Sequence, residues 1–146
     1  MSRRSESIRT TAAPAAIGPY SQAVRSGDLL FCSGQIGLDP TDGTLVAGGL
    51  EPQALRVLDN LQAVLLAAGG SLEDIVKLTV YLTDLSGFPV LNALMEQRLT
   101  APYPARATVE VSALPLGALV EIDLIARVPQ ADAAPGNEDR QGEADA

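Results

Sequence analysis

The spacing of apolar residues over positions 50–128 changes from helical to alternating and back, and this pattern restricts the fold more than any other feature. Apolar residues recur every three or four positions over residues 50–68, where Pro52 suits a first helical turn and Gly69-Gly70 supplies a stop. Residues 75–82 alternate apolar and polar side chains, which is typical of a strand with one apolar face. The pattern predicts a helix and, directly after it, a strand.

The rest of the chain supplies a second helix and more strands. Helical spacing returns over residues 88–99, and residues 107–111 and 119–128 are expected to be strands. Nearer the N-terminus, the apolar run 28–33 and the turn-forming residues 39–43 suggest two strands joined by a turn. The predicted order is βββ-α-β-α-ββ, an α+β fold in which both helices pack on one face of a mixed sheet.

The opposite face of such a sheet has no predicted cover. We expect Thr79, Tyr81, Thr108 and Glu121 on it, a mixture too polar for a core and too apolar for open water. Burial against other subunits resolves this conflict. The pattern therefore predicts an oligomer.

Length and charge divide the chain. Its 146 residues, 47% of them hydrophobic, suit one globular domain, which we place at residues 12–129. We expect residues 1–11 to be a flexible N-terminus. Residues 130–146 are acidic and lack large apolar side chains, so a disordered tail is predicted there, with an acidic docking segment as the alternative.

Composition excludes several functions. The net charge of −8 and the scarcity of aromatic residues argue against a nucleic-acid partner. The chain has no histidine and one cysteine, so it cannot supply a Ser-His-Asp triad, a Cys-His pair, a zinc cage or an internal disulfide. No metal and no cofactor are expected. We found no signal peptide or membrane-spanning segment, and a cytoplasmic location is the natural expectation.

Two charged residues are the strongest candidates for chemistry. Arg106 follows the proline-stiffened segment 102–105 and opens a strand, where a guanidinium can be held rigidly for bidentate binding of a carboxylate. Position alone fits equally a surface arginine or half of an ion pair. Glu121 lies between two apolar strand residues, and enclosure of its face would raise its pKa into the range useful for proton transfer. A solvated strand residue is the alternative.

Other polar candidates carry weaker signals. Tyr20 and the Ser33-Gly34 pair lie in loop-like segments that offer hydroxyls and backbone N–H groups, although turn formation explains both segments. Asn92, on the second helix, is either a surface residue or a substrate contact. Cys32 has no cationic neighbour in sequence and is expected to be a small buried hydrophobe.

Several motifs, in this order and at these separations, resemble the RidA (YjgF) family of enamine/imine deaminases, over about residues 12–128. These motifs are Ala13–Ala23, Ser33–Ile36, Leu58–Leu61, Ala67–Gly69, Pro104–Arg106, Leu114–Pro115 and Val120–Ile122. The resemblance implies a chorismate-mutase-like fold and a homotrimer with active sites between subunits. It also implies hydrolysis of 2-aminoacrylate and 2-aminocrotonate to 2-keto acids and ammonia.

The resemblance assigns roles residue by residue. Arg106 matches the clamp for the substrate carboxylate, and Glu121 matches the acid that positions the attacking water. The positions that match the lining of the pocket are Tyr20, Ser33, Gly34 and Asn92. Thr108 stands where many members have cysteine, so it keeps a hydrogen bond donor but not a thiol.

Three alternatives stay open. One is a non-catalytic trimer that binds a metabolite or acts as a holdase. Another is a deaminase for a larger catabolic enamine acid, in which Phe88 and Leu116 set the size of the pocket. The third is the ribonuclease activity attributed to some family members, against which the charge and the missing histidine argue.

Overall fold

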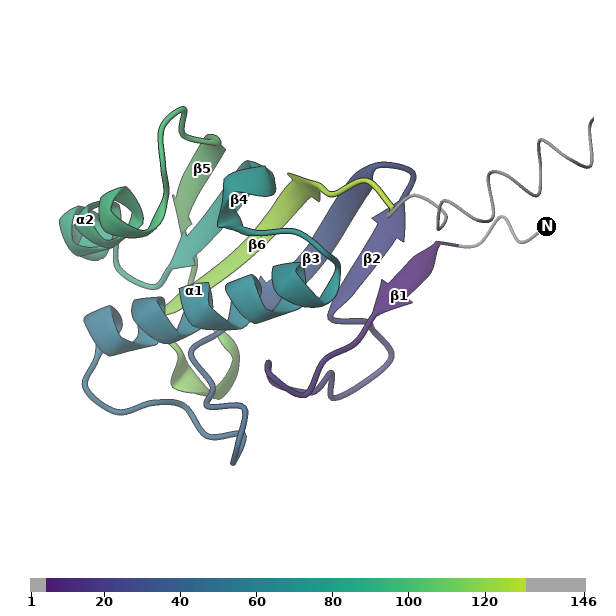
Figure 1. Cartoon of the computed structure of the whole chain (residues 1–146). Helices are drawn as coiled ribbons and strands as arrows, with labels where there is room; N and C mark the ends of the chain where they lie inside the picture. The colour runs from purple at the N-terminus through teal and green to yellow at the C-terminus, as the bar shows by residue number, and fades with distance from the viewer. Residues whose placement is uncertain (1–4, 131–146) are drawn as a thin grey trace, which may run out of the picture.

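The computed structural model describes residues 5–130, and these form one six-stranded mixed sheet with two helices (Figure 1). The strand order is β1-β2-β3-β6-β4-β5, with only β4 and β5 parallel. The strands are β1 (Glu6–Ile8), β2 (Ala23–Ser26), β3 (Leu29–Gln35), β4 (Ile75–Leu82), β5 (Ala105–Glu110) and β6 (Val120–Arg127). This confirms the predicted fold.

Both helices pack on one face of the sheet. Helix α1 (Leu50–Ala67) crosses it with one apolar side buried, while α2 (Phe88–Arg98) lies near the β5 edge (Figure 1). Single-turn 3₁₀ segments cover residues 72–74, 85–87 and 115–117. The core joins the buried side of α1 to the inner residues of β3, β4 and β6. No helix in the described part of the chain is long and apolar enough to cross a membrane.

The N-terminal strands differ from the prediction. The first hairpin is β2–β3, which turns at Gly27-Asp28, whereas the predicted turn at 39–43 leads only to an isolated bridge between Leu38 and Leu45. Residues 6–8, expected within a flexible N-terminus, form β1 and bury Ile8. Strand β1 has three residues, too few to show a hydrophobic period in the sequence. All of the predicted acidic tail except Gln130 lies outside the described residues.

The two faces of the sheet have different compositions. The helix-covered face carries the buried residues of β4 and β6, which alternate with partly exposed ones on the other face. Tyr81 pairs with Glu121 on that uncovered face, as predicted. Thr108 was placed there wrongly, because it pairs with the buried Val80 and lies on the helix-covered side. The sequence of β5 lacks an apolar alternation that would fix its orientation.

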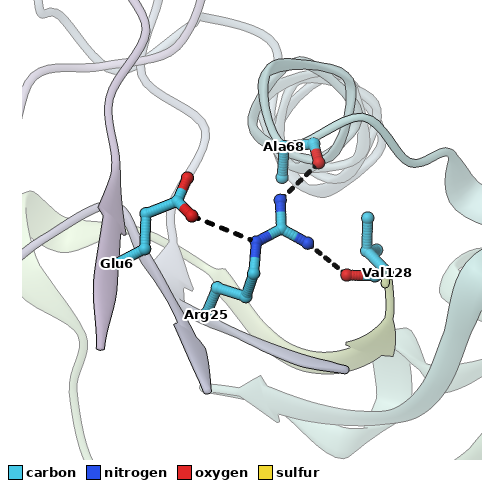
Figure 2. Close-up of polar contacts among 4 residues, drawn as sticks. All are labelled: Glu6, Arg25, Ala68 and Val128. Carbon is cyan, nitrogen blue, oxygen red and sulfur yellow. Dashed lines mark hydrogen bonds and ion pairs between the residues drawn. The ribbon is translucent and has the colours of Figure 1, made fainter. Parts of the chain in front are cut away.

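A buried arginine links three distant parts of the chain (Figure 2). The guanidinium of Arg25, 7% exposed, donates to the carbonyl of Ala68 at 2.6 Å and to the carbonyl of Val128. Its Nε lies 3.5 Å from a carboxylate oxygen of Glu6 in β1. A cation at the C-terminus of α1 also complements the helix dipole. Arg25 therefore fastens β1 and the end of β6 to the end of α1.

Arg25→Ala is expected to lower the free energy of unfolding by about 3 kcal/mol, because it leaves two carbonyls of the described fold without their charged donor. Urea unfolding at one fixed protein concentration measures the loss. The control Arg127→Ala removes an exposed ion pair of 3.8 Å with Asp28 and is expected to change stability by less than about 0.5 kcal/mol. Equal effects of the two changes would contradict this role of Arg25.

Candidate functional site

Arg106 is held from one side and has no acidic partner among residues 5–130. Its Nη1 donates to the Asn92 side chain at 2.8 Å and lies 3.6 Å from the Met95 sulfur, both on α2. The guanidinium carbon stands 5.0 Å from the centre of the Phe88 ring. No salt bridge joins Arg106 to an acidic side chain within residues 5–130. The remaining N–H groups of a rigid cation are thus available to an anionic ligand.

A pocket of about 360 Å³ opens beside Arg106, between α2 and the segment that leads into β5. Its lining consists of Leu78, Asn92, Met95, Glu96, Leu99, Tyr103, Pro104 and Arg106. Thr108 lies two residues along β5 from Arg106, with its hydroxyl oxygen buried and without a hydrogen bond partner in the described structure. These residues form the first half of the site.

Glu121 lies on the other face of the sheet, directly against Gly34. A Cβ atom at Gly34 would overlap the Glu121 carboxylate, so only glycine fits this position while the side chain keeps its place. Glu121 is half-buried, and burial, followed by the negative charge of Asp123, raises its pKa. The direction of this pKa shift is the one expected from the sequence if the face of Glu121 is enclosed.

Ser33 ties the Tyr20 segment to Gly34. The Ser33 hydroxyl donates to the Ser21 carbonyl at 2.6 Å, and its backbone N–H donates to the Gln22 carbonyl at 3.0 Å. The Tyr20 side chain is 53% exposed, and its hydroxyl accepts the Ile17 N–H at 3.4 Å. These hydrogen bonds connect the Tyr20 segment to the strand that carries Gly34, and Gly34 lies against Glu121, so this region is the candidate for a second half of the site.

The structure of one chain does not bring the two halves together. Arg106 pairs with the buried Leu78 and faces α2, whereas Glu121 pairs with Tyr81 on the uncovered face. A sheet separates groups on its opposite faces. The predicted residues thus form two partial sites rather than one.

Sequence reasoning missed part of the Arg106 half. Met95 touches Arg106 as well as the core, and neither it nor Tyr103 nor Glu96 was among the predicted site residues. The spacing of Phe88, Asn92 and Met95 puts their side chains on one side of α2, a signal that could have found them. Asp123, which affects Glu121, was also missed.

Cys32 is a buried hydrophobe, as predicted. Burial raises the pKa of its thiol to about 12, so thiolate chemistry is suppressed. Over residues 5–130, no group of three or more acidic, cysteine or histidine side chains gathers closely enough to hold a metal ion.

Comparison with known proteins assigns the family. The family described as Endoribonuclease L-PSP matches residues 10–128. A 2-iminobutanoate/2-iminopropanoate deaminase of Mus musculus is 48% identical over 119 residues, which cover 82% of this chain and 88% of that protein. A RutC family protein of Pyrococcus horikoshii is 47% identical, covering 83% and 96%.

A crystal structure of RidA from an Antarctic Psychrobacter superposes with a TM-score of 0.82 at 50% identity, covering 84% of this chain and 99% of that one. The chain belongs to the RidA (YjgF) family. Members of this family carry several names, deaminase, RutC and RidA among them, so membership gives the fold rather than one activity.

For this RidA family member, Glu121→Gln is expected to become more stabilising, relative to wild type, as the pH rises. The folded-state pKa of Glu121 is raised above its unfolded value, so the folded protein holds the carboxyl proton more tightly. The stability that this proton gives is present below the unfolded pKa and is lost as the pH rises through the folded pKa. Glutamine has no charge to bury.

Urea unfolding of wild type and variant at several values between about pH 4 and pH 8 tests this sign. In an Asp123→Asn background, the stabilisation by Glu121→Gln is expected to increase less as the pH rises, because one cause of the raised pKa of Glu121 is removed. If the free energies of unfolding of wild type and Glu121→Gln differ by the same amount at every pH, the pKa of Glu121 is not raised in the folded protein.

Proposed function

We propose that the protein hydrolyses reactive enamine and imine carboxylates, such as 2-aminoacrylate and 2-aminocrotonate, to 2-keto acids and ammonia. The observation that carries the proposal is the guanidinium of Arg106, held by Asn92 and Phe88 with no acidic partner in the described structure. Such a group fits a small carboxylate through two parallel hydrogen bonds. The deaminase names of close relatives support the same substrate class.

The chemistry needs few groups from the protein. An enamine acid tautomerises to the 2-imino acid, whose carbon C2 is already electrophilic. Water adds its oxygen to C2, the C–N bond then breaks, and the nitrogen leaves as ammonia while the C=O bond of the keto acid forms. Orientation and electrostatics supply most of the acceleration, and water is the only co-reactant, so no metal or cofactor is required.

Each residue has a role in this proposal. Arg106 binds the carboxylate, and Glu121, with its raised pKa, positions the water, accepts its proton and passes that proton to the departing nitrogen. Tyr20, Ser33, Gly34 and Asn92 line the site. The Thr108 hydroxyl, buried without a partner in the described fold, is free to donate to the substrate.

The site is completed between subunits of a homotrimer. Arg106 and Glu121 lie on opposite faces of the sheet, so a site that uses both needs the Arg106 half of one copy against the Glu121 half of another. Contact between two different surface patches forms a ring where the rotation between copies closes, and the trimer that the family resemblance implies is such a ring. Leu29, Phe31 and Val109, all large apolar residues of strands, are exposed in the single chain and suit burial there.

A coupled assay tests the function. A dehydratase releases 2-aminoacrylate or 2-aminocrotonate in the presence of semicarbazide, and wild type is expected to divert the imine to keto acid before it is trapped. Arg106→Ala is expected to lose about 100-fold or more in activity. Arg106→Lys is expected to lose most of it, since an ammonium cannot form the planar fork.

Arg127→Ala removes an exposed arginine at the opposite end of β6 from Glu121, and this matched control is expected to keep full activity. If wild type forms keto acid no faster than the protein-free blank but still binds a 2-keto acid, the protein is a non-catalytic binder instead. The ribonuclease name of the family finds no support in the net charge of −8 or in a chain without histidine.

Mixing two inactive variants tests the shared site. Arg106→Ala and Glu121→Gln subunits, unfolded and refolded together, are expected to recover about a quarter of the wild-type activity, because random assembly gives that share of sites two intact halves. Either variant refolded alone is expected to stay inactive. A mixture without recovered activity would show that both residues act within one chain, whereas activity of either variant alone would show that the residue it replaces is not needed.

A further inference from the structure

Two carboxylates and a tyrosine lie together on the uncovered face of the sheet. Tyr81 on β4 pairs directly with Glu121 on β6, and Asp123 follows Glu121 on the same face, two residues along the strand. The Tyr81 hydroxyl does not go to the carboxylate opposite it but donates to Asp123 Oδ2 at 2.9 Å. One donor thus lies beside two carboxylates, and it is committed to Asp123.

This choice of partner affects how basic Glu121 is. A hydrogen bond donated to the charged form of a carboxyl lowers its pKa and makes it a weaker base. Glu121 is spared that bond from Tyr81, and its pKa is raised by burial and then by the charge of Asp123. The pKa of Tyr81 is raised as well, first by its hydrogen bond to Asp123, so the hydroxyl remains a donor at neutral pH. Asp123 therefore both engages the donor and adds a negative charge beside Glu121.

The other charged side chains of this face lie farther from Glu121. Strand β4 carries Lys77, about 13 Å along the strand from Tyr81, and β6 carries Arg127 at its far end. Strand β3 has no charged residue, and the charged residues of β5 pair with buried residues of β4, so they lie on the helix-covered side. Asp123 is thus the nearest charged neighbour that the described sheet gives Glu121.

We propose that Tyr81 is a positioning residue for the reaction: its hydroxyl holds Asp123 beside Glu121 and leaves the Glu121 carboxylate free to receive the proton of the attacking water. The inference rests on the proposed function. The proposed trimer brings Arg106 of a neighbouring copy to this site, and that positive charge opposes proton uptake by Glu121. The negative charge that Tyr81 holds in place offsets this effect, so the carboxyl keeps the basicity that the reaction needs.

The pH dependence of hydrolysis tests this role, because two variants are expected to move it in opposite directions. Tyr81→Phe removes a hydroxyl that neutralises part of the Asp123 charge, so the rise of kcat/KM with pH is expected to move up by about half a pH unit. Asp123→Asn removes the charge itself, so the rise is expected to move down by about as much. Both replacements keep nearly the shape of the original side chain, so the fold is expected to survive them.

A control variant and a second measurement make the test specific. Thr79→Val removes another hydroxyl of the same face, opposite Asp123, and is expected to leave the profile in place because Tyr81 supplies the hydrogen bond to Asp123. For each protein, kcat/KM for 2-aminocrotonate is measured from about pH 4.5 to pH 8, with spontaneous hydrolysis and trapping by semicarbazide determined at every pH without protein. Carbon-13 NMR of labelled glutamate carboxyls, assigned with Glu121→Gln, follows the titration of Glu121 even in a variant too slow for kinetics.

The outcomes separate this inference from the proposed function. Opposite shifts of Tyr81→Phe and Asp123→Asn, in the kinetics or in the NMR titration, would support the positioning role. Shifts in the same direction, or no shift in either variant while hydrolysis continues, would overturn the role of Tyr81 and leave the deaminase standing. If wild type hydrolyses no imine, the deaminase and the role of Tyr81 are both overturned.

Discussion

Burial of one face of the sheet under two helices is the constraint on which the rest of the structure depends. It forces the apolar residues of β4 and β6 inward, and strand alternation then places Tyr81, Glu121 and Asp123 on the opposite face. That face has no cover in a single chain. The exposed apolar side chains of the strands follow from this unequal division of the sheet.

Two arginines show how the fold uses the same side chain in opposite ways. Arg25 is buried, and its N–H groups meet the carbonyls of Ala68 and Val128, so its charge serves the architecture (Figure 2). Arg106 is exposed and is gripped by Asn92 on one side only. A cation with satisfied donors cannot take a ligand, whereas one held on a single side is already oriented for it.

The sequence predicted the elements whose hydrophobic period is long and regular, namely α1, α2, β4 and β6. It failed where the period is absent: β1 is too short to show one, and β5 has no apolar alternation, so Thr108 was assigned to the wrong face. The choice of Arg106 and Glu121 came from strand position and family resemblance together. Their separation by the sheet depends on pairing between distant strands, which no local pattern records.

The absence of histidine agrees with the chemistry proposed for this site. An imino acid brings its own electrophilic carbon, so the protein must hold a carboxylate and place a water rather than create a strong nucleophile. Thr108 can then replace a cysteine without loss of mechanism, because no step uses a thiol. Because the proposed reaction needs few groups from the protein, selection between substrates depends on the protein surfaces that contact the rest of the substrate. The pocket beside Arg106 offers such a surface, with the buried side chains of Leu78, Met95 and Leu99 in its lining.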